Sequence, residues 1–199
     1  MTAMRWREGL VIGLGLLVLA ALAVGYARGP RLYDYGTATV GGPKGWPVFV
    51  EQLILDGRWR VGVGILEGGF DAMPPRYGAL AASDPRPVPK TLHARWFSHR
   101  TQTYYEIDLT LPEDLEARVR RWYRRYPPPD YLHFLVTGIA GDGRVYVWWR
   151  ANCIRCPLYD HSQDFYEPLI PLAHGRVVEG DPNRYRKRTE HVRKLGLIP

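Results

Sequence analysis

The chain has 199 residues, a formal net charge of +7 and an aromatic content of 13%. Outside one N-terminal apolar run, about 170 residues remain, which is enough for a single domain with a proper core and too few for two. The mild excess of basic residues suits an acidic protein or an anionic lipid surface as a partner. The aromatic content fits a β-rich domain, because Trp and Tyr pack well on pleated faces.

The chain begins with residues 1–8, which carry basic side chains, followed by an uncharged run from Gly9 to Ala27. A helix over that run would be about 30 Å long, which matches the hydrocarbon core of a bilayer. A retained transmembrane anchor and a signal peptide cleaved near Ala21-Leu22-Ala23 are both open interpretations, and the length of the run favours the anchor. Both place residues 1–8 in the cytoplasm and residues 28–199 in the periplasm as one β-rich domain. An exported body argues against nucleic acid as a partner.

Alternation of apolar and polar residues predicts three β-hairpins, whose strand pairs are 48–55 with 58–66, 90–98 with 103–111, and 131–140 with 144–150. The first pair flanks Asp56-Gly57, a two-residue turn that matches the twist of the strands. In the last strand Val145, Val147 and Trp149 share one face. Between the first two hairpins, residues 67–89 are rich in Gly and Pro and are predicted to form a long surface loop.

One amphipathic helix is predicted between Pro112 and Pro127, with acidic residues in its first turn and five arginines after them. Its apolar residues recur at helical spacing and should face the sheet: Leu115, Val119, Trp122 and Tyr126. The arginines either bind phosphates or lipid head groups, or form a solvated helix face. Residues 181–195 are rich in bases and are assigned a short surface helix.

These elements predict a mainly β fold of the β-rich α+β type. An antiparallel sheet would fold over as a sandwich or an open barrel, with one amphipathic helix packed on it and one transmembrane helix before it.

Both cysteines of the chain, Cys153 and Cys156, fall in one short segment. In an oxidising periplasm they could pair and staple a local loop. The spacing also resembles a redox motif, although the residues after Pro157 lack the helical spacing that such a motif normally precedes. Zinc would need two further ligands, of which only His161 is evident.

The sequence contains no recognisable catalytic motif, and the predicted protein is not an enzyme and has no cofactor and no metal. His93 and Arg95 would share the outward face of one strand, with His99 just past its end. Such a cluster either forms a site or belongs to an ordinary polar sheet surface.

Four segments in the body carry a family resemblance: residues 45–51 (GWPVFVE), 94–98 (ARWFS), 104–109 (YYEIDL) and 136–148 (VTGIAGDGRVYVW). In order and spacing they resemble the bacterial family known as domain of unknown function 2931, over roughly residues 33–150. The resemblance implies an exported envelope protein, and some such proteins look like immunity partners of type VI secretion effectors, including lipases. Many are lipoproteins, whereas this chain has an apolar span and no lipid-accepting cysteine. The resemblance brings no catalytic residues with it.

The predicted function is therefore that of a membrane-anchored periplasmic binding protein, which neutralises an effector toxin by stoichiometric binding. Aromatic and arginine residues on loops and strand edges are the expected anchors: Trp46, Arg76, Tyr77 and Trp148. Two alternatives remain open, a structural component of the envelope and a redox protein that uses Cys153 and Cys156.

Overall fold

The computed structural model describes residues 30–42, 45–62, 64–66, 79–157 and 160–199, with side chains omitted at 79–83. All of its elements belong to the unit Tyr33–Pro199. The strands are β1 (Tyr33–Gly41), β2 (Val48–Leu55), β3 (Trp59–Arg60), β4 (Ile65–Leu66), β5 (Ala79–Arg86), β6 (Thr91–Ser98), β7 (Thr103–Thr110), β8 (Tyr131–Ile139), β9 (Arg144–Cys153), β10 (Phe165–His174) and β11 (Arg176–Val178). The helices are α2 (Leu115–Arg125), the 3₁₀ turn η1 (Pro182–Tyr185) and α3 (Arg186–Lys194).

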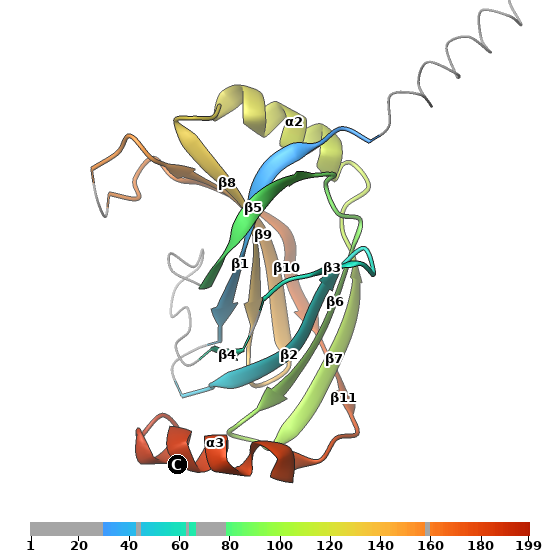
Figure 1. Cartoon of the computed structure of the whole chain (residues 1–199), viewed down its shortest axis with the longest axis vertical. Helices are drawn as coiled ribbons and strands as arrows, with labels where there is room; N and C mark the ends of the chain where they lie inside the picture. The colour runs from blue at the N-terminus through green and yellow to red at the C-terminus, as the bar shows by residue number, and fades with distance from the viewer. Residues whose placement is uncertain (1–29, 43–44, 63, 67–78, 158–159) are drawn as a thin grey trace, which may run out of the picture. The chain divides into compact units, whose positions relative to one another are not determined.

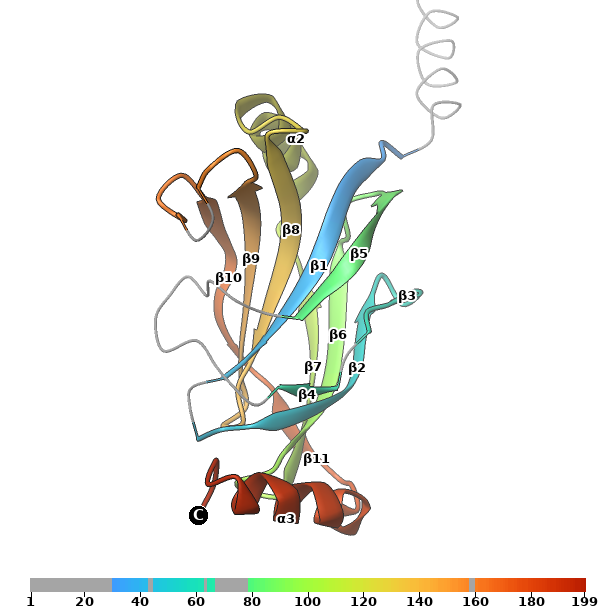
Figure 2. The same cartoon turned by 60° about the vertical axis from the view of Figure 1, so that its left-hand side comes forward.

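The strands form two sheets, which Figures 1 and 2 show from two sides. Sheet A has the order β10-β9-β8-β1-β5, and sheet B has the order β11-β7-β6-β2-β3, with β4 also pairing with β2. The described strands do not close into a barrel. Sheet A is mixed, because β1 runs parallel to β8 while its other neighbours pair antiparallel. The prediction of a purely antiparallel sheet was wrong at this pair.

One apolar core joins the two sheets and α2. Trp149 of sheet A and Trp96 of sheet B are both fully buried in it, and α2 contributes Leu115, Val119 and Trp122. The two indoles keep hydrogen bonds in this apolar setting, as buried polar groups must. The Trp96 indole donates to the Ala140 carbonyl at 3.1 Å, and the Trp149 indole donates to Nδ1 of His133 at 3.0 Å.

The predicted hairpins and helix are confirmed in position, and the predicted alternation is confirmed in β9. Val145, Val147 and Trp149 face the core, whereas Tyr146 and Trp148 belong to a separate cluster on the other face of β9. The strand predicted over 58–66 is shorter than expected, because only β3 and β4 pair with β2 there.

The prediction of a loop over 67–89 was wrong for its second half, where β5 forms the edge of sheet A. Pro85 is tolerated in that strand because an edge strand needs fewer backbone donors. Residues 67–78, and with them the predicted anchors Arg76 and Tyr77, lie outside the described residues.

Among the described residues, no helix combines the length and the apolar character needed to cross a membrane. The predicted anchor at Gly9–Ala27 lies outside them.

The fold has a second helix, α3, within the range assigned to a short surface helix. Together with η1 it packs on the outer face of sheet B, where Tyr185 contacts Phe49 and Phe97 at ring-centroid distances of 4.7 and 5.0 Å. The Tyr185 hydroxyl donates to Glu51 of β2 at 2.6 Å, and Arg184 lies 3.2 Å from the same carboxylate. Glu51 thus joins two consecutive residues of the C-terminal segment to sheet B.

His99 follows the end of β6, as the sequence places it, but it lies beneath α3 and is fully buried, so it does not join an exposed cluster with His93 and Arg95. Its Nδ1 lies 2.8 Å from the Thr189 hydroxyl. Burial and the nearby Arg188 cation lower the pKa of His99 from 6.5 to about 4. Burial also lowers the pKa of His133 in the core.

We predict that the protein loses stability as the pH falls from about 6.5 toward 4. In this window the unfolded chain binds protons at His99 and His133 that the folded chain does not, so the free energy of unfolding rises with pH. The shift at His99 corresponds to about 3 kcal/mol. Urea unfolding of the full chain at a series of pH values measures this slope. H99Q should flatten it, while the control H174Q, at an exposed histidine, should keep it. Equal slopes for H99Q and the wild type would remove His99 as the source.

Candidate functional site

The two predicted anchors that the structure describes lie in different surroundings. Trp46 precedes β2 and is half-buried, with the Arg100 guanidinium 4.5 Å from its ring centroid. Trp148 is only 4% exposed and stacks on Tyr146 at 5.6 Å between ring centroids. A ring buried to this extent offers little surface to a partner, whereas Trp46 keeps part of its ring accessible.

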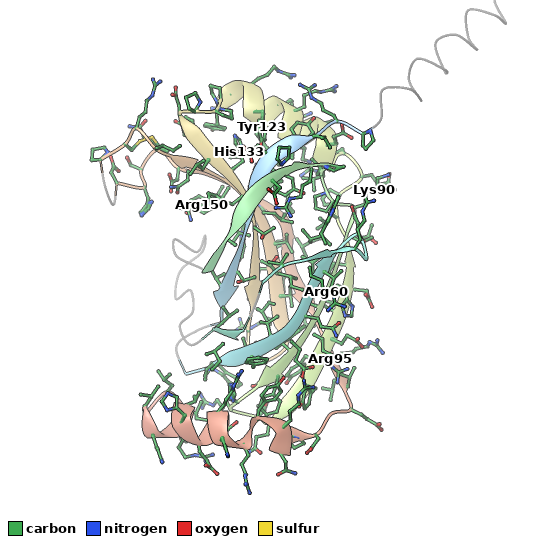
Figure 3. The ribbon with its side chains drawn as sticks, in the orientation of Figure 1. Arg60, Lys90, Arg95, Tyr123, His133 and Arg150 are labelled. Atoms are coloured by element: carbon green, nitrogen blue, oxygen red, sulfur yellow. A yellow bond between two sulfur atoms is a disulfide. The ribbon has the colours of Figure 1, made fainter. Side chains whose placement is uncertain are left out.

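The outward histidine and arginine of β6 both contact carboxylates on sheet B. Nδ1 of His93 lies 2.9 Å from Asp108, and Nε of Arg95 donates to Glu51 at 2.9 Å. Figure 3 shows Arg95 on this sheet, near the end where α3 packs. These contacts are those of a polar sheet surface.

A disulfide closes a short loop at the end of β9. Cys153 and Cys156 are bonded to each other, and neither cysteine of the chain is free. The loop between them carries Ile154 and Arg155, whose side chains are exposed to 49% and 73%. The sequence left three interpretations of these cysteines open: a disulfide, a redox pair and a metal site. In the structure the two cysteines form a disulfide.

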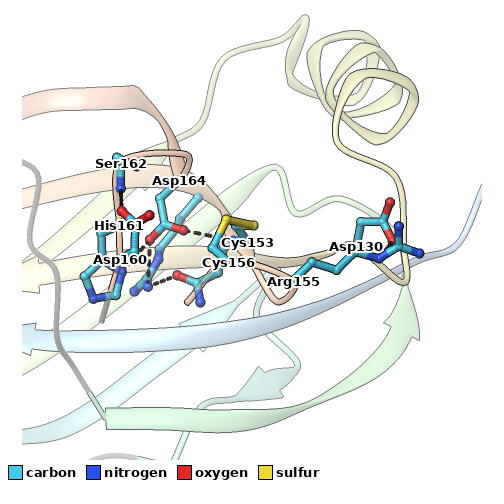
Figure 4. Close-up of a disulfide and its surroundings, with 10 residues drawn as sticks. Asp130, Cys153, Arg155, Cys156, Asp160, His161, Ser162 and Asp164 are labelled. Atoms are coloured by element: carbon cyan, nitrogen blue, oxygen red, sulfur yellow. Dashed lines mark hydrogen bonds and ion pairs between the residues drawn. A yellow bond between two sulfur atoms is a disulfide. The ribbon is translucent and has the colours of Figure 1, made fainter. Parts of the chain in front are cut away.

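The carboxylate of Asp164 fixes this loop from one side (Figure 4). It is only 1% exposed, and one of its oxygens accepts the backbone N–H of Cys153 at 2.8 Å. The other oxygen lies 2.9 Å from Nδ1 of His161 and 3.3 Å from the guanidinium of Arg150. His161, considered above as a zinc ligand, is therefore a partner of Asp164. A buried carboxylate needs such donors, because desolvating an unpaired charge is costly.

Asp130 fixes the loop from the other side. Its carbonyl accepts the backbone N–H of Ile154 at 2.9 Å, and its carboxylate lies 2.6 Å from Nε of Arg155. Two aspartates from different parts of the chain thus contact residues 153–155, and the disulfide ties Cys156 to them. Sequence reasoning missed both aspartates.

An exposed apolar side chain on the neighbouring strand adds to this surface. Leu132 of β8 is 50% exposed, and its residue pairs in register with Asn152, just before the loop. We name Leu132, Ile154 and Arg155 the disulfide-loop surface. Arginine and exposed apolar side chains on a rigid support are typical of protein interfaces, since a loop already held in place loses little entropy on binding.

A cavity of about 230 Å³ lies where β6 and β7 meet the start of α2, lined by Val88, Pro89, Lys90, Thr110, Leu111, Pro112, Glu113, Leu115 and Glu116. Sites for small molecules usually measure roughly 300–1,000 Å³. In the described part of the chain, no group of three or more His, Cys, Asp or Glu could hold a metal ion. We take the disulfide-loop surface as the candidate site because its exposed side chains lie on a loop held by a disulfide and two aspartates.

We predict that D164N destabilises the fold by about 3 kcal/mol, because it removes the charge that buried Arg150 faces. Hydrogen exchange should also accelerate at residues 153–156, since the loop loses its strongest acceptor. Urea unfolding and exchange mass spectrometry measure the two effects. The matched control D160N removes a solvent-accessible aspartate from the same segment and should change neither. A D164N protein as stable and as protected as the wild type would contradict the role given to this carboxylate.

Comparison with known proteins finds one family model that covers most of the chain. It matches residues 30–194 and is described as a protein of unknown function, DUF2931. No curated protein and no solved structure matches the chain. The match covers both sheets and both helices, and the chain belongs to the DUF2931 family.

Proposed function

We propose that this protein is a membrane-anchored periplasmic binding protein that neutralises a toxic effector by stoichiometric binding. In this role it would be an immunity protein against a type VI secretion effector, with lipase-like toxins as the first class to test. The observation that carries the proposal is the disulfide-loop surface, in which Ile154 and Arg155 are presented on a loop that two aspartates and a disulfide hold still.

Two further features support an exported location. Disulfides persist mainly in oxidising compartments such as the bacterial periplasm, and here Cys153 and Cys156 are bonded to each other. The uncharged run from Gly9 to Ala27 is long enough to hold the body at the membrane. The basic excess of the chain also suits an acidic protein partner.

We predict that I154D/R155E weakens capture of the effector at least about thirtyfold, the loss expected when an interface anchor is removed. The full chain is solubilised from membranes, immobilised and exposed to proteins secreted by its own organism. A dominant secreted toxin is then identified, its affinity is measured, and protection is tested by co-expression in a host that the toxin kills.

The matched control is R176E/V177D on β11. Like I154D/R155E, it replaces an exposed apolar residue by Asp and an adjacent arginine by Glu. Val177 is exposed, and Arg176 has one carboxylate partner, as Arg155 does. This control should bind as the wild type does. Unchanged binding by I154D/R155E would show that the interface lies elsewhere, with Trp46 as the next residue to replace. Recovery of resident envelope proteins in place of a toxin would favour a structural role.

The same assay separates binding from redox chemistry. If C153S/C156S still protects cells from the toxin, no thiol or disulfide chemistry is required, and a lower affinity would report only a looser loop. If protection is lost while the affinity is unchanged, the redox alternative would replace the proposal.

A further inference from the structure

The outer face of α2 is a cluster of arginines. Arg120, Arg121, Arg124 and Arg125 are exposed, and we name them the arginine face. Residues at i and i+4 lie on the same side of a helix, so these four form two adjacent rows. The opposite side of α2 is buried in the core, which fixes the direction in which the arginines project.

Carboxylates near the arginine face interact with it only weakly: the pKa of Asp114 is lowered mainly by its hydrogen bond with Arg118, and the charge of Arg121 makes the last of the contributions. The ion pairs that α2 makes with other described residues involve Arg118, which lies 2.9 Å from Asp114 and 4.0 Å from Glu167. Among the residues that the structure describes, no carboxylate lies within ion-pair distance of the four arginines of the face. The Arg125 guanidinium lies 5.5 Å from the centroid of the Tyr126 ring. The ring is uncharged, so Arg125 keeps its net positive charge.

The position of α2 in the fold is fixed next to the start of β1. Tyr123 contacts the ring of Tyr33 at 5.2 Å between centroids, and its hydroxyl donates to the carbonyl of Asp34. Figure 3 shows Tyr123 at this end of the unit, and Figures 1 and 2 show α3 at the opposite end. At about 3.5 Å per residue, the chain from Ala27 to Tyr33 spans at most about 20 Å. Tyr33 and the helix that contacts it therefore stay close to the surface of any membrane that holds Gly9–Ala27.

We propose that the arginine face binds the anionic phospholipid headgroups of the membrane that anchors the chain. The inference rests on the anchoring part of the proposed function and adds a second contact, which would orient the body on the bilayer. The guanidinium group suits this partner because it binds phosphate oxygens through two parallel hydrogen bonds and remains charged at all physiological pH values. Each such cation near an anionic surface strengthens association about fivefold.

The test uses the full chain in lipid nanodiscs made of phosphatidylcholine alone or with phosphatidylglycerol. Phenylglyoxal, which modifies accessible arginines, is added, and mass spectrometry follows each site. We expect modification of the arginine face to slow at least about fivefold with phosphatidylglycerol. Arg186 and Arg193 on α3 serve as internal controls and should react equally in both discs. At about 1 M salt, where the Debye length is about 3 Å, the protection should disappear.

Two charge-matched variants separate this surface from net charge. R120Q/R121Q/R124Q removes three cations from α2, and R186Q/K187Q/K194Q removes three from α3. Arg125 should lose its protection in the first variant and keep it in the second. Soluble glycerophosphoglycerol, added to phosphatidylcholine discs, should give no protection, because the proposed partner is a lipid surface and not a free phosphate ester.

Each result has one meaning. A chain that does not remain with the discs on gel filtration would overturn the anchoring part of the proposed function. A chain that remains, but whose arginine face reacts equally in both discs, would overturn this inference alone. Equal protection of α2 and α3 would show general attraction by net charge, and protection by the soluble ester would show a phosphate site. Either of these two outcomes would also overturn the inference that the arginine face binds lipid headgroups.

Discussion

A chain of two hydrogen bonds in the core joins sheet A to the end of α2. The indole of Trp149 donates to Nδ1 of His133, and Nε2 of His133 lies 2.7 Å from the carbonyl of Tyr126, just past the end of α2. His133 must therefore carry its proton on Nε2 and remain neutral, since a charged imidazole could not accept the indole proton. One tautomer thus links the central strands of sheet A to the helix that carries the arginine face. His133 thus contributes both to the response of the fold to acid and to the placement of the helix that carries the arginine face.

Much of the fold could be predicted from local patterns, because those patterns record which side of an element is buried. Strand β9 alternates clearly, and α2 has apolar residues at helical spacing between two prolines. Strand β1 gives no such signal, because it is a central strand with both faces covered, and its glycines and small residues do not alternate. Its parallel pairing with β8 is a contact between distant segments. Strand β10 is hidden by Pro168 and Pro171, which an edge strand with bulges tolerates.

The candidate site could be predicted only in part, because it too depends on contacts between segments that are distant in the sequence. The spacing of Cys153 and Cys156 allowed a stapled loop, and the structure joins them. Asp130 and Asp164 looked like ordinary loop carboxylates, and only the tertiary fold brings them to the two sides of that loop. Trp148 was chosen because it is aromatic and lies on a strand, but the second apolar cluster covers it. Composition indicates which residues can anchor a partner, whereas exposure depends on the neighbours.

The parallel pair of β1 and β8 also has a consequence for biogenesis. If the chain is threaded across a membrane from its N-terminus, β1 emerges long before the strand beside which it must lie. The centre of sheet B, made of β2, β6 and β7, can assemble first, since β6 and β7 are joined by a short turn. Until β8 and β9 follow, β1 presents an unpaired edge, and such edges are sites of mispairing with other chains. The period between the arrival of β1 and that of β8 is when a chaperone would benefit this protein most.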